Sequence, residues 1–146
     1  MCGLAGFYSF NSLPEGYREK LDRALINIGH RGPDFHGTYS DAHIALAHAR
    51  LSIIDVSENG NQPMTDAGGN FVLIYNGACY NHRELRKILL EKGVTFKSES
   101  DTETVLYCLI TYGADGLRDI NGFFSLAMYD KKNKKLAAVL LITGIV

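Results

Sequence analysis

Residues 1–10, "MCGLAGFYSF", decide how this chain is interpreted, because they place a cysteine directly behind the initiator methionine. The aromatic residues within 4–10 follow no helical period, and the polar, proline-containing "NSLP" of residues 11–14 interrupts them. This pattern predicts a first strand that runs from close to the N-terminus. Cys2 is therefore expected at the leading edge of a strand.

A cysteine at position two can become the true N-terminal residue, since initiator methionine is commonly removed when the next side chain is small. The freed α-amine, with a reference pKa of about 7.7–8.0, then lies beside a thiol with a reference pKa of about 8.5. Proton transfer between them costs on the order of 1 kcal/mol, so one residue can supply both nucleophile and base. The alternative is a small buried cysteine without a function, and "MC" alone favours that alternative.

The composition indicates one globular domain with a small ligand. With 146 residues and 46% hydrophobic content, the chain can bury one core and has no room for two. Its 15 basic and 16 acidic residues give a formal net charge of -1. Because this balance provides no positive field, we expect no nucleic-acid partner and no membrane partner.

Three cysteines, Cys2, Cys79 and Cys108, are an odd number in a chain that lacks a basic and apolar leader at its start. This combination favours a reducing, cytoplasmic setting, and Cys79 and Cys108 are expected to be buried thiols. The closing run "LAAVLLITGIV", residues 136–146, is shorter than the roughly 20 apolar residues that cross a bilayer. It is interpreted as a buried strand.

The first half of the chain predicts one amphipathic helix between strands and loops. The helix has Pro14 in its first turn and stops at Gly29. Residues 29–41 predict a glycine-rich loop, residues 43–54 a strand or strand pair, and residues 55–70 a long loop. One face of the helix is apolar at spacings of three and four: Tyr17, Leu21, Ala24, Leu25 and Ile28.

The middle of the chain predicts a strand followed by a helix. Residues 71–77 form a buried strand that ends in an Asn-Gly pair. Residues 81–93 form a helix in which Asn81 and Glu84 resemble a capping box, and residues 94–98 form a short strand.

The remaining sequence predicts a second helix and a hairpin. Ser100 and Glu103 have capping-box spacing, so Asp101 lies in the first turn of that helix. Residues 122–130 and 136–142 form two strands joined by a lysine-rich turn. Because strands outnumber helices and alternate with them unevenly, we expect an α+β layered domain.

Five motifs occur in the order found in one family, and together they are highly specific. The chain resembles the N-terminal glutaminase domain of class II glutamine amidotransferases, most closely the asparagine synthetase branch. The resemblance runs from Met1 to about Lys135 and implies the four-layer αββα sandwich of N-terminal nucleophile hydrolases. The motifs are "MCGLAGF" (1–7), "HRGPD" (30–34), "HARLSIID" (48–55), "YNGACYNHRELR" (75–86) and "SDTE" (100–103).

The resemblance assigns the reaction centre to three residues. Cys2 is the nucleophile that attacks the side-chain amide of L-glutamine and forms a thioester. The side-chain amide of Asn76 and the backbone N–H of Gly77 stabilise the oxyanion that this attack creates. Without the resemblance, "NG" would be interpreted as a tight turn.

The resemblance also assigns the ligands of the substrate's charged groups. Arg50 suits the α-carboxylate, because its planar guanidinium can hold both oxygens. Asp101 matches the ligand of the α-ammonium group. Taken alone, Arg50 would be a surface cation and Asp101 a favourable charge at a helix N-terminus. Four further residues match the segment that lines the same pocket: Leu51, Ser52, Ile53 and Ile54.

Other candidate residues carry no catalytic assignment. Asp34 within "HRGPD" resembles a loop-fixing residue. The histidines show no paired ligand spacing on one helix, so we expect no metal site and interpret them as surface or packing residues. They are His30, His36, His43, His48 and His82.

The chain departs from the family at two places. Ala78 stands where the family more often has a glutamate that helps to recognise the ammonium group, so we expect weaker binding of glutamine. After "KKNKKL" the family continues into further strands, whereas this chain reads "AAVLLITGIV" and stops. Residues 1–146 are therefore interpreted as a partial amidotransferase domain with an incomplete second sheet.

Nothing in the sequence resembles the synthetase domain with which such glutaminases pair. We expect no cofactor in residues 1–146, because ATP and magnesium would belong to that synthetase domain. The expected partners are L-glutamine and a synthetase domain or subunit that accepts ammonia. Three functional classes stay open: a glutamine-hydrolysing enzyme, which we favour, a catalytically impaired glutamine-binding or interaction remnant, and a redox thiol protein, which the lack of a CxxC motif disfavours.

Overall fold

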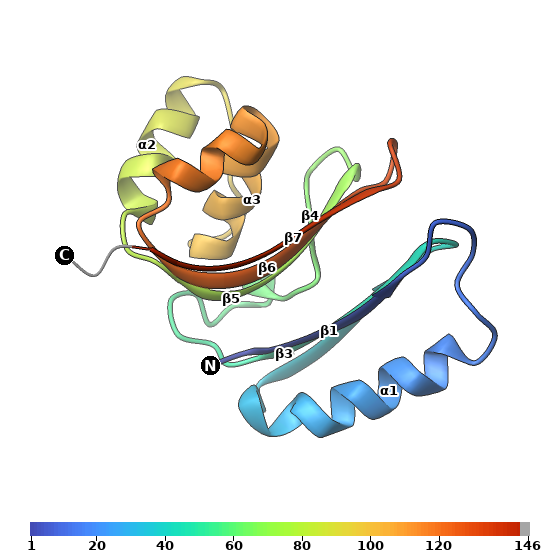
Figure 1. Ribbon diagram of the computed structural model, residues 1–146. Helices are drawn as coiled ribbons and strands as arrows, with labels where there is room; N and C mark the ends of the chain where they lie inside the picture. The colour runs from blue at the N-terminus through green and yellow to red at the C-terminus, as the bar shows by residue number, and fades with distance from the viewer. Residues whose placement is uncertain (144–146) are drawn as a thin grey trace.

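The computed structural model describes residues 1–143 and arranges them in four layers, helix, sheet, sheet and helix (Figure 1). Two antiparallel sheets face each other. Helix α1 (Tyr17–Ile28) covers the outer face of one sheet, while α2 (His82–Glu91) and α3 (Asp101–Tyr112) cover the outer face of the other. The expected αββα sandwich is therefore confirmed. Within the described range, no helix has the length and apolar character needed to span a membrane.

The first sheet, sheet A, has the strand order β1-β3-β2 and is built around a fully buried central strand. It contains β1 (Gly3–Tyr8), β2 (Phe35–Ser40) and β3 (Ile44–Arg50). Successive side chains of β3 point to opposite faces. Ala45 and Ala47 pack with Leu21 of α1, whereas Ile44 and Leu46 pack toward the second sheet. Because both faces of β3 are covered, its sequence is an almost continuous apolar run.

The second sheet, sheet B, has the strand order β4-β5-β6-β7 and carries α2 and α3 on its outer face. Leu73 and Tyr75 of the second strand pack under these helices against Leu85, Leu89 and Leu106. The strands are β4 (Met64–Thr65), β5 (Phe71–Cys79), β6 (Gly122–Asp130) and β7 (Lys135–Thr143). Within residues 1–143, three 3-10 segments complete the fold: η1 (Gly29–Arg31), η2 (Glu58–Gly60) and η3 (Gly113–Asp119).

The pairing register brings the ends of both sheets together. In sheet A, Gly3 lies opposite Ala49, so the residues before Gly3 lie beside the end of β3. In sheet B, Asn76 lies opposite Ser125, directly after Tyr75, the middle residue of β5. The N-terminus and the end of β3 therefore lie beside the middle of β5 at one end of the sandwich (Figure 1).

A buried histidine joins the two sheets close to this end. His48 of β3 is 0% exposed, and its Nε2 lies 3.1 Å from the carbonyl oxygen of Tyr75 in β5. Since a carbonyl can only accept, Nε2 carries the proton and donates it. Burial is the main cause that lowers the pKa of His48 to about 4. His48 is therefore neutral in the folded protein at neutral pH, in agreement with a packing role.

Three expected elements differ from the structure in the first half of the chain. Residues 35–40 form strand β2 rather than a loop, because an exposed edge strand needs no apolar alternation. The strand expected over 43–54 ends at Arg50. Beyond it, the backbone N–H of Ser52 donates to Asp34 Oδ2 at 2.7 Å and not to a neighbouring strand. Helix α1 begins at Tyr17, so Pro14 lies before its first turn.

Both expected capping boxes are changed by tertiary contacts. The Asn81 side chain caps no helix N–H; it donates to Asp119 O at 2.8 Å and accepts from Asn121 N at 2.9 Å. Ser100 does cap α3, since its hydroxyl accepts from Thr102 N at 3.0 Å. Glu103, however, reaches past the cap to the segment before it.

The segment over 94–98 is not the expected strand. The carboxylate of Glu103 accepts from the backbone N–H groups of Lys97 at 2.9 Å and Ser98 at 2.7 Å. The ring of Phe96 lies against Tyr107 and under the guanidinium of Arg86. The Glu103 carboxylate thus provides the hydrogen-bond acceptors for these two backbone N–H groups that a neighbouring strand would otherwise provide.

The apolar strand near the C-terminus is less buried than expected, because β7 is the edge of sheet B. Leu136 and Val139 are half-buried and the two alanines between them are exposed. Residues 144–146 of the run lie outside the described residues.

Among residues 1–143, β1 has no strand partner on its outer side. An apolar groove of about 420 Å³ runs between β1 on one side and β6 and β7 on the other. The incomplete second sheet stays a prediction.

We predict that His48 makes the fold sensitive to mild acid. Unfolding restores an ordinary histidine pKa of 6.5, above the folded value of about 4. Between these pH values the unfolded state binds a proton at His48 and the folded state does not. The unfolding free energy should therefore fall as the pH drops from about 6.5 to about 4, by an amount of about 3 kcal/mol. Urea unfolding at a series of pH values measures this slope.

The matched variants are His48→Gln and His36→Gln. The first keeps a neutral donor for Tyr75 O and should flatten the slope, while the second replaces an exposed histidine and should keep the part of the slope that the buried His48 causes. Equal slopes for the wild type and His48→Gln would contradict the prediction.

Candidate active site

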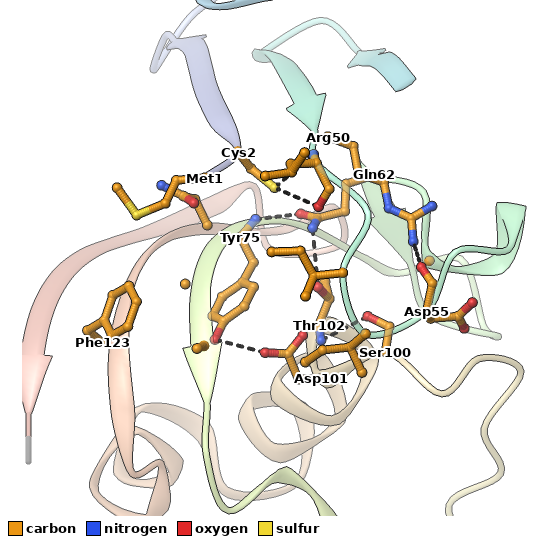
Figure 2. A pocket seen from close by; sticks show the side chains of 17 residues that line it. Met1, Cys2, Arg50, Asp55, Gln62, Tyr75, Ser100, Asp101, Thr102 and Phe123 are labelled. Atoms are coloured by element: carbon orange, nitrogen blue, oxygen red, sulfur yellow. Dashed lines mark hydrogen bonds between the residues drawn. The ribbon is translucent and has the colours of Figure 1, made fainter. Parts of the chain in front are cut away.

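A cavity of about 180 Å³ lies where the two sheets meet at the end that contains the N-terminus. It is smaller than the ~300–1,000 Å³ typical of sites for drug-sized ligands, so it suits a ligand of amino-acid size. It is lined by the two residues before β1, by residues of β3, β5, β6 and the start of α3, and by the loop after β3 (Figure 2). Of the ten residues assigned to the site from the sequence, nine line this cavity: Cys2, Arg50, Leu51, Ile53, Ile54, Asn76, Gly77, Ala78 and Asp101.

Cys2 is held at the end of β3 by its side chain and at η1 by its backbone carbonyl. Its Sγ accepts from Leu51 N at 3.4 Å and lies 3.8 Å from Leu51 O, which accepts the thiol proton. Its carbonyl oxygen accepts from Nε of Arg31 at 3.0 Å. The thiol is only half-buried and faces the cavity (Figure 2). Arg31 lies in the "HRGPD" motif, and its role had no other signal in the sequence.

Asn76 and Gly77 lie within β5, which continues to Cys79, and not at a strand end as expected. Gly77 is required by close packing, because a Cβ there would overlap the carbonyl oxygen of Phe123 and the Cα of Phe124 in the neighbouring strand. Asn76 is half-buried at the cavity. Ala78, the next residue, adds an uncharged methyl group to the lining.

Asp101 brings a buried carboxyl group to the opposite wall. Asp101 is 7% exposed, and Oδ2 accepts from Cys79 N at 3.0 Å. Oδ2 also accepts from the Tyr75 hydroxyl at 3.4 Å (Figure 2). Burial raises the pKa of Asp101, and these hydrogen bonds oppose the rise only in part. Burial also raises the pKa of Tyr75, so its hydroxyl is a neutral donor to the carboxylate.

Arg50 is the last residue of β3, and the loop that follows the strand surrounds its guanidinium. Nη1 donates to Ser57 O at 2.8 Å and to Asn61 Oδ1 at 2.7 Å, and Nη2 donates to Asp55 O. A guanidinium has five N–H groups, so two remain for another acceptor. Arg50 therefore holds the loop and still lines the cavity.

Three of the residues 51–54 line the cavity, and the fourth fixes the start of the loop. Leu51 contacts Cys2, and Ile53 and Ile54 line the cavity although they are 75% and 48% exposed. Ser52 is the one assigned residue that does not line this cavity. Its backbone bond to Asp34 Oδ2 fixes the start of the loop, as expected for a loop-fixing aspartate.

Gln62 is a cavity residue that sequence reasoning missed. Its side chain is 5% exposed, accepts from Tyr75 N at 2.6 Å and donates to Thr102 Oγ1 at 3.2 Å (Figure 2). It therefore connects the residue before Asn76 to the residue after Asp101. No signal in the sequence distinguished it, because residues 55–70 read as a loop.

The remaining candidates lie apart from the cavity. Cys79 and Cys108 are free, buried thiols as expected, and burial raises their pKa values to about 12 and about 11. Within residues 1–143, no three His, Cys, Asp or Glu side chains are grouped so that they could hold a metal ion.

Comparison with known proteins agrees with this arrangement. The family described as "Glutamine amidotransferase domain" matches residues 1–140. Asparagine synthetase [glutamine-hydrolyzing] 3 of Bacillus subtilis is 36% identical over 140 residues, which cover 94% of this chain and 23% of the relative. Asparagine synthetase B [glutamine-hydrolyzing] of Escherichia coli is 35% identical over 132 residues, covering 90% of this chain and 24% of the relative. The chain thus spans about a quarter of the length of these relatives.

A solved structure supports the fold independently of close sequence similarity. The glutamine phosphoribosylpyrophosphate amidotransferase of B. subtilis, complexed with ADP and GMP, superposes with a TM-score of 0.74 at 16% identity. The superposition covers 96% of this chain and 37% of that protein. The sandwich, the nine residues gathered at one cavity and the match over residues 1–140 lead to one conclusion: this chain belongs to the glutamine amidotransferase domain family.

Proposed function

We propose that this chain hydrolyses the side-chain amide of L-glutamine to glutamate and ammonia, with Cys2 as the nucleophile. The observation that carries the proposal is the meeting of Cys2, Asn76 and Asp101 at one cavity, although they lie far apart in the sequence. Family membership supports the same reaction.

The reaction begins once Met1 is removed. Met1 is 63% exposed at the cavity, where an aminopeptidase can reach it. The freed α-amine of Cys2 accepts the thiol proton, and the thiolate attacks the amide carbon of glutamine. Asn76 and Gly77 stabilise the resulting oxyanion, the amine returns the proton to the leaving nitrogen, and ammonia departs. Water then cleaves the thioester, which releases glutamate and restores the thiol.

Recognition uses two opposite charges on opposite walls of the cavity. Asp101 binds the α-ammonium group, and the two free N–H groups of Arg50 bind the α-carboxylate. Desolvation of the Asp101 carboxylate strengthens its attraction to a cation, because the local dielectric is low. Ala78 adds no charge, so the ammonium contact depends on Asp101 alone.

The ammonia acceptor is a second part of the proposal. The relatives are named asparagine synthetases, and this chain matches about a quarter of their length. We propose that a synthetase domain or subunit receives the ammonia that this domain releases.

The first prediction concerns the nucleophile. After removal of Met1, a glutamine analogue with an electrophilic ketone in place of the amide should label Cys2 once per chain, because only this thiol faces the cavity among the three cysteines. Intact-mass measurement gives the stoichiometry and peptide mapping gives the site. Stoichiometric labelling of Cys79 or Cys108 would show that the assignment is wrong.

The second prediction separates catalysis from binding. Asn76→Ala should lower kcat by about 10²–10³, because an oxyanion donor acts mainly on the transition state. Arg50→Lys should mainly raise KM, since lysine cannot hold the carboxylate with a planar fork. Steady-state release of glutamate measures both variants, and an unchanged kcat for Asn76→Ala would refute its role.

The third prediction follows from the raised pKa of Asp101. As the pH falls, this carboxylate takes up a proton at a higher pH than an ordinary aspartate does, and its attraction to the ammonium group is lost. KM for glutamine should therefore rise on acidification, and the rise should begin at a higher pH than an ordinary aspartate would give. In Asp101→Asn, KM should be about 10–100-fold higher and should lose this pH dependence.

Thermal unfolding provides the control for Asp101→Asn. The raised pKa means that the folded state disfavours the charged form, and asparagine keeps an acceptor for Cys79 N. The variant should therefore unfold at the wild-type temperature or above it. A lower unfolding temperature together with a lower kcat would instead indicate a structural role.

A further inference from the structure

Gly60 lies where no side chain fits beside Arg50. It is the last residue of η2 and is buried. A Cβ at Gly60 would overlap Nη2 of Arg50 and lie 3.0 Å from its Cζ, whereas the nearest backbone atom, Asp55 O, is 3.3 Å away. Its φ is not positive, so its backbone conformation is open to alanine. The guanidinium itself therefore occupies the space that a side chain would take.

The loop around Gly60 surrounds the guanidinium with acceptors. Asp55 O, Ser57 O and Asn61 Oδ1 accept from Nη1 and Nη2, and all three belong to one stretch of seven residues. Arg50 is only 6% exposed as a result. We call residues 55–61 the arginine loop.

The arginine loop is also tied to the opposite wall of the cavity. The carboxylate of Asp55 accepts from Ser57 N at 2.8 Å inside the loop and from Glu99 N at 2.8 Å outside it. Glu99 immediately precedes Ser100 and Asp101 at the start of α3. The loop that holds the cation is therefore connected to the segment that carries the anion.

We propose that the arginine loop sets the position of the Arg50 guanidinium for the α-carboxylate of the substrate, with Gly60 as the positioning residue. This inference rests on the proposed glutaminase function. The side-chain-free surface of Gly60 lets the guanidinium lie against the loop and keep its two free N–H groups toward the cavity. A side chain at this position has to displace the flexible end of Arg50, whereas the nearest backbone atom, Asp55 O, has to give by only a few tenths of an ångström.

The test is Gly60→Ala in the enzyme from which Met1 has been removed. Ammonia release is measured from L-glutamine and from its α-amide, in which an uncharged carboxamide replaces the α-carboxylate. KM for L-glutamine should rise about 10–100-fold while kcat stays within a factor of about three, because a charge-assisted contact is lost. kcat/KM for the α-amide should be unchanged, so the preference for the carboxylate falls.

Gly68→Ala is the matched control. A Cβ at Gly68 would likewise crowd the ends of polar side chains, Nδ2 of Asn70 at 2.9 Å and Oδ2 of Asp66 at 3.0 Å, but in an exposed turn between β4 and β5. This variant should keep the wild-type KM and substrate preference.

Asn61→Ala tests the loop without adding bulk. It removes one acceptor of Nη1 and should shift KM and substrate preference in the same direction by a smaller factor. A wild-type substrate preference in Gly60→Ala would overturn the proposal, and so would an equal loss of kcat on both substrates. If Gly60→Ala does not fold, an unchanged preference in Asn61→Ala overturns it.

The wild-type enzyme separates this proposal from the proposed function. If it hydrolyses glutamine and Gly60→Ala keeps the substrate preference, only the role of the arginine loop is wrong. If the wild type neither releases ammonia nor takes up the electrophilic glutamine analogue at Cys2, both proposals are wrong.

Discussion

The hydrogen bond between His48 Nε2 and Tyr75 O is the contact on which the geometry of the cavity depends. It joins the central strand of sheet A to the central part of sheet B in a fully buried position. Arg50 lies two residues beyond His48, and Asn76 follows Tyr75. Because packed sheets slide only at the expense of such buried contacts, this bond fixes the two walls of the cavity relative to each other.

A second set of contacts places charge within those walls. Asp101 is buried, accepts two hydrogen bonds and still has a raised pKa, so the fold holds a carboxylate that it does not fully compensate. Arg50, by contrast, gives three of its N–H groups to neighbouring oxygens. One wall thus offers the Asp101 carboxylate to a cationic group, and the other offers the Arg50 guanidinium, which hydrogen bonds hold in place. Such a pair of environments is suited to a zwitterionic ligand and costs stability in the empty protein.

The sequence predicted the strands and helices whose apolar patterns face the core, such as β3, β5 and α1, and missed those that depend on tertiary contacts. β2 is an exposed edge and has no apolar alternation, while residues 94–98 are held by Glu103 from the next helix. For the site, the family motifs predicted Cys2, Asn76 and Asp101, and all three line the cavity. Gln62 was missed because its side chain bridges two distant segments, and local patterns contain no information about such a bridge.

The crowding at Gly77 has a consequence for protein engineering. Any side chain there would collide with the backbone of β6, so no substitution of Gly77 is compatible with the β5–β6 ladder. Ala78 and Ile53 also line the cavity, and Ile53 is largely exposed. A library aimed at amides other than glutamine should therefore diversify positions 78 and 53, where new side chains enter the cavity, and hold position 77 constant.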